Sequence, residues 1–339
     1  MKRKPLIVIT MGDPAGIGPE IIAKVIDSGE LYALCRPVVI GDAGVMKKII
    51  EEMRFSISIR SIASLAQADP DQGKLDVLDL KMVDLAAHKW GRPDISSGKA
   101  VVEYIKKAVA LTMNGEADAI VTAPINKEMM NAAGYPYAGH TELLAYLTAS
   151  QEYGMLFVGG GLRVILATIH VALKDVHKHI KTGTILKTLR LAHKAMQAFG
   201  IEKPRIGVAA LNPHAGEGRL FGSEEWDEIL PAVIKGREEG IDASDPVPAD
   251  TLFYKARNNY YDIVVAMYHD QGLAPLKMMA FGNAVNVTVG LPIIRTSVDH
   301  GTAYDIAGKG CADPASLLEA VRLAIKLTAY KKSAAGENA

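Results

Sequence analysis

Three histidines each follow a short apolar run of the sequence. "VILATIH" ends at His170, "GVAALNPH" at His214 and "IVVAMYH" at His269. Apolar runs of this length are typical of strands covered on both faces, and ligands of α/β sheets bind beyond the carboxyl ends of the strands. Three imidazoles that converged there would hold one divalent metal with a coordination position open, as catalytic zinc sites do. The alternative is three ordinary hydrogen-bonded loop residues.

A second set of polar residues begins with Asn126 and Lys127 after a predicted strand and with His140 and Thr141 at a predicted helix start, and three further members follow at short intervals. An arginine supplies bidentate contacts and a lysine supplies a point charge. The start of a helix has free backbone N–H groups, so the set suits a phosphate or a carboxylate. Each residue alone could also be an ordinary surface group, although the apolar context "GLPIIRTSVDHG" favours a functional arginine. The members are His140, Thr141, Lys277, Asn286 and Arg295, with Asn126 and Lys127 in "TAPINK".

The segment "MYHDQGLAPLK" combines His269 with Asp270 directly after an apolar run. Gly272 and Pro275 predict that the chain turns sharply there instead of continuing in regular structure. Asp270, and Asp250 in "PADTLF", are candidates for a general base or for a carboxylate that orients a ligand imidazole. Both aspartates could equally be turn caps.

The glycine-rich segments match neither standard nucleotide-binding fingerprint. "GDPAGIGPE" has glycines at positions 12, 16 and 18, and "VGGGLR" covers 158–163. Neither has the GxGxxG spacing, and no P-loop lysine follows a glycine-rich turn. These glycines are therefore interpreted as tight turns.

The order of predicted elements indicates an α/β fold with mainly parallel sheets. Strands are expected at 6–10, 37–40, 118–123, 163–169, 205–211, 262–268 and 285–289. Amphipathic helices are expected between them, at 96–115, 184–200, 223–240 and 313–330. The sequence contains no internal repeat or flexible linker.

Composition excludes several classes of function. The 339 residues contain 38 Lys plus Arg and 38 Asp plus Glu, so no global basic surface exists for nucleic acid or an anionic membrane. The two cysteines are far apart in the sequence and favour a reducing compartment over a disulfide framework. The N-terminal run "LIVIT" is too short for a signal peptide, and no apolar stretch reaches the roughly 18 residues of a membrane span. We therefore expect a cytoplasmic protein.

Long segments of the chain resemble the 4-hydroxythreonine-4-phosphate dehydrogenase family of vitamin B6 biosynthesis. They are "ITMGDPAGIGPE", "TAPINK", "GHTE", "LNPHAGEG", "PADTLF", "YHDQGLAPLK" and "VNVTVGLPIIRTSVDHGTAYDIAGKG". The resemblance implies a fold similar to isocitrate and isopropylmalate dehydrogenases, with two α/β/α domains and an active site in the interdomain cleft. We expect the first domain at 1–125 plus 285–335, with both termini and the NAD loop. The second is expected at 126–284, with metal, substrate and dimer contacts.

The resemblance also assigns residues. It places a divalent metal (zinc, magnesium or cobalt) on His170, His214 and His269, and substrate on His140, Thr141, Lys277, Asn286 and Arg295. It implies a homodimer with a shared active site, in which one metal histidine comes from the partner, with His269 as the candidate. The relatives bind NAD through the "HGTAYDIAG"-like loop, so the cofactor candidates are His300, Gly301, Thr302 and Asp305. A carboxylate at Asp305 would accept hydrogen bonds from a ribose and repel a 2′-phosphate, which favours NAD over NADP.

The implied reaction is the metal-dependent oxidation of 4-phosphohydroxy-L-threonine by NAD. Its 3-keto acid product would lose carbon dioxide to give 3-amino-2-oxopropyl phosphate. The same chemistry on D-threonate or D-erythronate 4-phosphate is an alternative, because "TMGDPAG" and "GNAVNVTVG" depart from the pattern of the B6 enzymes. Family members that oxidise ring dihydrodiols are less similar, since His140, Lys277 and Arg295 favour a phosphorylated substrate. A metal-dependent phosphatase or hydrolase and a non-catalytic phosphosugar-binding protein are the rival classes.

Overall fold

The computed structural model describes residues 3–69, 71, 73–334 and 336. The chain divides into two compact units, which we call the first and second units. The first consists of Met1–Gln151 with Leu291–Ala339, and the second of Glu152–Gly290. In the described part of the chain, no helix is both long and apolar enough to cross a membrane.

This division places residues 126–151 in the first unit, whereas we expected them in the second domain. The reason is the packing of two short helices, α5 (Lys127–Ala132) and α6 (His140–Leu147), against the long helix α4 (Ile95–Met113). Gly98 of α4 permits the close approach, because a Cβ there would lie 2.1 Å from the carbonyl oxygen of Met129. The segment 285–290 belongs to the second unit, where it forms an antiparallel strand.

The first unit is built on a parallel sheet. Its strands are β1 (Leu6–Thr10), β2 (Arg36–Gly41), β3 (Ser58–Ile62), β4 (Lys74–Asp79), β5 (Ala119–Thr122) and β11 (Arg295–Val298), in the order β3-β4-β2-β1-β5-β11. Residues of β1, β5 and β11 are buried throughout, as expected for central strands covered on both faces. Burial of these strands on both faces therefore explains why their sequences are near-continuous apolar runs.

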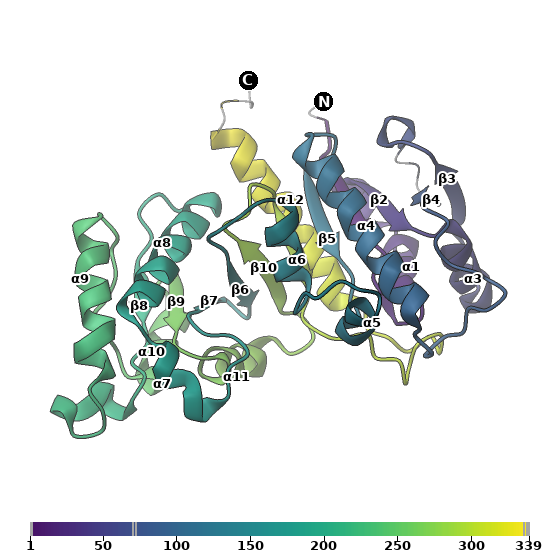
Figure 1. Cartoon of the computed structure of the whole chain (residues 1–339). Helices are drawn as coiled ribbons and strands as arrows, with labels where there is room; N and C mark the ends of the chain where they lie inside the picture. Colours follow the sequence, from purple (N-terminus) through teal and green to yellow (C-terminus); the bar gives the residue numbers. More distant parts are fainter. Residues whose placement is uncertain (1–2, 70, 72, 335, 337–339) are drawn as a thin grey trace. The chain divides into compact units, whose positions relative to one another are not determined.

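Helices of the first unit pack in two groups (Figure 1). One group is α1 (Gly18–Asp27), which contacts α2 (Glu30–Leu34), α3 (Ala43–Met53) and α12 (Ala315–Ala334). The other is α4, which contacts β1 and β2 together with α5 and α6. A short 3-10 turn, η1, covers Leu65–Gln67.

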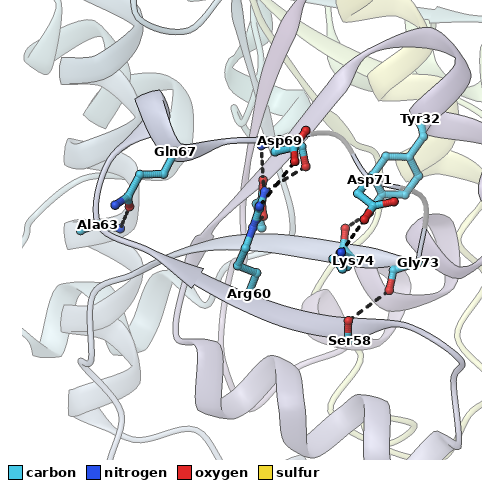
Figure 2. Close-up of polar contacts among 10 residues, drawn as sticks. Tyr32, Ser58, Arg60, Ala63, Gln67, Asp69, Asp71, Gly73 and Lys74 are labelled. Atoms are coloured by element: carbon cyan, nitrogen blue, oxygen red, sulfur yellow. Dashed lines mark hydrogen bonds and ion pairs between the residues drawn. The ribbon is translucent and has the colours of Figure 1, made fainter.

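At its β3 edge, the first sheet is fixed by side-chain hydrogen bonds (Figure 2). The guanidinium of Arg60 on β3 donates to Asp76 on β4 through Nε (2.6 Å to Oδ1) and Nη2 (2.7 Å to Oδ2). The hydroxyl of Tyr32 donates to the carbonyl oxygen of Lys74 at 2.5 Å. A bidentate pair of this kind has a defined geometry, so it fixes the pairing of the two strands.

The second unit has a mixed sheet. Its strands are β6 (Gly154–Gly159), β7 (Leu162–Leu166), β8 (Ile206–Val208), β9 (Ile263–Ala266) and β10 (Val285–Val289), in the order β10-β6-β7-β9-β8. The pairs β10–β6 and β6–β7 are antiparallel, while β9 is parallel to both β7 and β8. One core cluster includes Val164, Leu252, Val264, Leu273 and Leu276.

The helical segments of the second unit follow these strands (Figure 1). They are η2 (Leu173–Asp175), α7 (Val176–His179), α8 (Thr182–Ala198), η3 (Pro213–Arg219), the π-helical η4 (Glu225–Ile229), α9 (Leu230–Glu238), α10 (Ala249–Arg257) and α11 (His269–Ala280).

The predicted α/β class is confirmed, and each of the seven expected strand regions contains a strand. The strands β3, β4, β6 and β11 were not expected. β3 carries partly exposed polar residues, so its sequence lacks the apolar run that marks a buried strand.

The predicted turn after His269 is wrong, because residues His269–Ala280 form helix α11. Gly272 permits this helix to approach the sheet closely, because a Cβ there would lie 2.8 Å from the side chain of Val164 and 2.9 Å from that of Leu166. Pro275 lies inside the helix, where it removes one backbone hydrogen bond without ending the helix. The buried Gln271 donates to the carbonyl oxygen of Ala210 at 2.6 Å and attaches the helix start to its surroundings.

Candidate active site

The three histidines follow neighbouring parallel strands of the second unit. His170 comes four residues after β7, His269 directly begins α11 beyond β9, and His214 lies in η3 beyond β8. Since the order is β7-β9-β8 and all three strands run in parallel, their carboxyl ends share one edge of the sheet. The predicted placement of the histidines beyond strand ends is therefore observed.

His170 and His269 lie close together. Their ring centroids are 6.0 Å apart and the ring planes are inclined by 38°. Two imidazoles on one tetrahedral zinc have ring centres about 5 Å apart, so a small rotation of the side chains would allow both to bind one ion. This pair is thus compatible with metal binding in the type of its donors and in its spacing.

Asp270 orients the imidazole of His269. Oδ1 of Asp270 lies 2.6 Å from Nδ1 of His269, and a carboxylate can only accept, so Nδ1 carries the proton. Nε2 of His269 then has the lone pair that a metal requires. A carboxylate in this position is the usual support of a metal-binding histidine.

His214 differs from the other two. Its ring is exposed, Nδ1 lies 3.0 Å from Oε2 of Glu217, and the ring edge faces Phe221 at a centroid distance of 6.2 Å. The segment from His214 to Gly218 has positive φ at every residue, a conformation that costs energy for the non-glycine residues. Among the described residues, no group of three or more His, Cys, Asp or Glu side chains is arranged to hold a metal ion. One chain therefore brings together two of the three predicted ligands.

Asp250, the second candidate base, lies exposed in the first turn of α10. Within the described ranges, its side chain has no hydrogen bond and no ion pair. An aspartate in a first helical turn interacts favourably with the helix dipole. Of the two aspartates, Asp270 is the one that the structure places beside a predicted ligand.

In the first unit, a buried arginine lies beside the start of α6. Arg295 on β11 is 2% exposed, and its Nη2 donates to Oγ1 of Thr122 on the adjacent strand β5 at 2.7 Å. Burial lowers the pKa of Arg295 to about 9, and the charge of Glu142 opposes this shift. The guanidinium therefore remains positive at neutral pH in a setting that strengthens its attraction for an anion.

His140 and Thr141 begin α6, as predicted, with Gly139 as the N-cap. Burial lowers the pKa of His140 well below its usual range, and the positive charges of Arg295 and Lys127 lower it further. Nε2 of His140 is buried and has no hydrogen-bond partner in the described structure. Gly139 provides no side chain to cap the helix, so its first-turn N–H groups add to a site suited to an anion.

The remaining predicted substrate residues lie in the second unit. Lys277 is half-buried in the last turn of α11, and Asn286 is on β10 opposite Phe157 of β6. Oδ1 of Asn286 is buried and accepts no hydrogen bond from any described residue. A buried amide oxygen without a donor is available to a ligand hydroxyl or amine.

The predicted cofactor residues form an irregular loop of the first unit. His300 and Asp305 are exposed, and an added Cβ at Gly301 would meet no atom within 4 Å. The side chain of Thr302 is half-buried, while its carbonyl oxygen accepts from the amide of Ile17 at 3.0 Å. The open space at Gly301 leaves room for a ligand, the exposed carboxylate of Asp305 could accept from ribose hydroxyls, and the exposed imidazole of His300 could donate to a phosphate.

Comparison with known proteins shows which family combines these features. The model of the family described as pyridoxal phosphate biosynthetic protein PdxA matches residues 33–324. The chain belongs to the PdxA family. The resemblance found in the sequence is thereby confirmed, and the chain is a dehydrogenase, as the named PdxA relatives are.

Two curated PdxA relatives with different names are almost equally similar. The 4-hydroxythreonine-4-phosphate dehydrogenase of Desulforapulum autotrophicum is 48% identical over 323 residues, covering 95% of each chain. The D-threonate 4-phosphate dehydrogenase of Cupriavidus necator is 47% identical over 324 residues, covering 95% of this chain and 97% of the relative. A solved structure of 4-hydroxythreonine-4-phosphate dehydrogenase from Klebsiella pneumoniae is 40% identical, with a TM-score of 0.90, and covers 96% of this chain and 100% of that one.

Sequence reasoning did not assign some residues at these PdxA sites. Lys127 affects the pKa of His140, although only its place after a predicted strand drew attention to it. Asp13 and Tyr304 form a hydrogen bond beneath the predicted cofactor loop. No local signal pairs two residues that are 291 positions apart in the sequence.

Proposed function

We propose that the chain oxidises the C3 hydroxyl of 4-phosphohydroxy-L-threonine with NAD and a divalent metal ion (zinc, magnesium or cobalt). The observation that carries this proposal is the buried Arg295 beside His140 at the uncapped start of α6. A buried guanidinium with helix N–H groups suits a phosphate, which is the group that the names of the PdxA relatives include. His140, Thr141, Lys277, Asn286 and Arg295 would bind the substrate.

His170, His214 and His269 are the proposed metal ligands, and Asp270 would keep the imidazole of His269 in the tautomer that presents Nε2. When bound, the metal would polarise the substrate hydroxyl, and the nicotinamide would accept hydride from the same carbon. Asp270 and Asp250 remain the candidates to take up the hydroxyl proton. His300, Gly301, Thr302 and Asp305 would bind NAD, with Asp305 disfavouring the 2′-phosphate of NADP.

Oxidation at C3 gives a β-keto acid. The bond between C2 and the carboxylate then breaks, carbon dioxide leaves, and the new carbonyl stabilises the electron pair that remains on C2. Protonation at C2 gives 3-amino-2-oxopropyl phosphate. D-threonate 4-phosphate is the second candidate substrate, because the relative named for it is within one percentage point of identity of the first. D-erythronate 4-phosphate would follow the same chemistry.

An assay of NADH formation tests this function. The purified chain would be incubated with NAD, one of the three metals, and either 4-phosphohydroxy-L-threonine, D-threonate 4-phosphate or D-erythronate 4-phosphate. We expect the first substrate to give the highest kcat/KM, with loss of turnover in chelator. Higher kcat/KM on D-threonate 4-phosphate would transfer the proposal to that substrate. No NADH with any substrate and metal would refute the proposed reaction.

We also propose a homodimer in which the partner supplies one metal histidine, since the described part of one chain contains no three-ligand group. The family resemblance made His269 the candidate for the shared ligand, whereas the 6.0 Å between the ring centroids of His170 and His269 in one chain favours His214. If His269 is the shared ligand, mixing inactive His170→Ala and His269→Ala chains under exchange should restore about a quarter of wild-type activity, because half of the dimers would be mixed and each would have one intact site. Restoration with the His170→Ala and His214→Ala pair instead would assign His214 to the partner.

A further inference from the structure

The segment "GDPAGIGPE" has a defined structural task, although its glycines match no nucleotide fingerprint. It lies under the loop 300–312 of the same unit. The amide of Ile17 donates to the carbonyl oxygen of Thr302 at 3.0 Å, and a Cβ on Gly16 would lie 3.0 Å from the same oxygen. Gly18 is equally constrained, because a Cβ would lie 2.2 Å from the carbonyl oxygen of Met11. These glycines permit close backbone packing.

A buried carboxylate reaches from this segment to the middle of the loop. The hydroxyl of Tyr304 donates to Oδ2 of Asp13 at 2.6 Å, and Oδ1 of Asp13 accepts from the amide of Ala15 at 2.9 Å. Asp13 is fully buried, and burial raises the pKa of its carboxyl group despite these hydrogen bonds. Burying a carboxylate costs free energy, so its presence here calls for a reason other than stability.

A third segment, 88–91, contacts both the segment 13–20 and the loop 300–312. The amide of Gly91 donates to the carbonyl oxygen of Ala15 at 2.8 Å, and a Cβ on Gly91 would lie 2.6 Å from the carbonyl oxygen of Tyr304. The ring of Trp90 packs on Gly308, where a Cβ would lie 2.5 Å from the ring. Segments 13–20 and 88–91 therefore both pack against the loop 300–312.

The far end of the loop is fixed by an ion pair. The buried carboxylate of Glu20 accepts from the amides of Gly310 (3.3 Å) and Ala312 (2.8 Å). Lys24 pairs with Glu20 at 3.0 Å and donates to the carbonyl oxygens of the same two residues at 2.9 and 2.6 Å. With this end held, the hydrogen bond between Asp13 and Tyr304 is a side-chain contact that fixes the middle of the loop, where the Tyr304 hydroxyl also interacts with Asn126 and Thr302.

We propose that Asp13 is a positioning residue for cofactor binding: its carboxylate holds the Tyr304 hydroxyl, and thereby holds residues 300–305 in the conformation that receives NAD. This inference rests on the proposed function, because it takes the 300–305 loop as the NAD site. Tyr304 lies between the candidates Thr302 and Asp305 in the sequence. Release of its hydroxyl would therefore move the backbone on both sides.

Tyr304→Phe tests the proposal, since it removes the hydroxyl and keeps the ring. We expect the Kd for NAD, measured by calorimetry, to rise about tenfold, as for loss of a hydrogen bond to a charged group. The KM for NAD should rise in parallel, while kcat and the KM for the phosphorylated substrate change less than twofold. Hydrogen exchange of the amides in 302–308 should be faster than in the wild type without any cofactor present.

Asp13→Asn and the double variant complete a cycle. If the two side chains act through one contact, Asp13→Asn with Tyr304→Phe should weaken NAD binding no more than the worse single variant does. Tyr32→Phe is the matched control: it removes a hydroxyl that donates to a carbonyl oxygen at the β3–β4 edge (Figure 2). It should leave NAD affinity and loop exchange unchanged.

The outcomes separate this inference from the proposed function. A wild-type chain that binds no NAD would refute the cofactor assignment and with it the cofactor role of Asp13, and the exchange data would then show whether the contact still orders the loop. A wild type that binds NAD, with Tyr304→Phe equal to it in affinity and in loop exchange, would overturn the positioning role alone. If Tyr304→Phe raised the KM for NAD and the KM for the phosphorylated substrate equally and lowered the Tm, the contact between Asp13 and Tyr304 would have only a structural role.

Discussion

The guanidinium of Arg295 donates a 2.7 Å hydrogen bond to the hydroxyl of Thr122, from β11 to its neighbour β5 in the first unit. This contact fixes one edge of the guanidinium group inside the protein, where its positive charge is shielded from water. A fixed, buried arginine costs stability in the free protein and acts strongly on an anion that reaches it.

Replacing Arg295 with methionine should separate binding from stability. We expect kcat/KM for the phosphorylated substrate to fall about 100-fold, because charged hydrogen bonds to the anion are lost. The free energy of unfolding in urea should stay equal or rise, because a buried charge is replaced by an apolar chain of similar length. A large loss of stability with unchanged kcat/KM would show that Arg295 has a structural role.

The stability of the ligand-free chain should depend on His140 at mildly acidic pH. Its pKa is lowered in the folded state by burial and by Arg295 and Lys127, so the native protein resists protonation there. Below the unfolded pKa of about 6.5, the unfolded chain takes up a proton that the native chain does not, and stability falls as the pH falls.

Urea unfolding at pH 7.5 and pH 5.5 measures this effect. The wild type should lose about 1.4 kcal/mol more than His140→Asn over this interval, since one pH unit below the unfolded pKa corresponds to that amount. The exposed His177→Asn is the control, and it should keep the wild-type pH dependence. Equal losses in the wild type and in His140→Asn would contradict the lowered pKa.

Asp270 should influence metal affinity without itself binding the metal. Asp270→Asn removes the carboxylate that lies 2.6 Å from Nδ1 of His269 and leaves both imidazoles in place. We expect zinc affinity, measured by competition with a chelating dye, to fall 10- to 100-fold, as is typical for loss of a carboxylate that supports a ligand histidine. The exposed Asp242→Asn should have the wild-type affinity. An unchanged affinity in Asp270→Asn would remove Asp270 from the metal site.

Gly272 should be intolerant of a methyl group. A Cβ there would lie within 3.0 Å of Val164, Leu166 and Ala266, so Gly272→Ala should lower the free energy of unfolding by about 1–3 kcal/mol. Gly183→Ala in α8 is the matched control, since no atom lies within 4 Å of its added Cβ. It should stabilise the helix by about 0.5–1 kcal/mol. Stabilisation by both substitutions would show that α11 can move away from the sheet.

Much of the fold followed from local pattern. Near-continuous apolar runs marked β1, β2, β5 and β9, because a strand covered on both faces buries nearly every side chain. β3 was not expected, since an edge strand can carry polar residues on its exposed side. The helix α11 was missed for a related reason. Glycine and proline usually end helices, but here packing on the sheet requires Gly272, and the helix continues through Pro275.

The sequence alone determined the family, the α/β class, the placement of three histidines beyond strand ends and the start of a helix at His140 and Thr141, because these are properties of contiguous residues. Only the tertiary structure brought His170 within 6.0 Å of His269, and Tyr304 within 2.6 Å of Asp13. It also decided that Arg295 is buried and that His140 has a lowered pKa. These are properties of distance and desolvation between residues far apart in the chain, and strand order sets such distances.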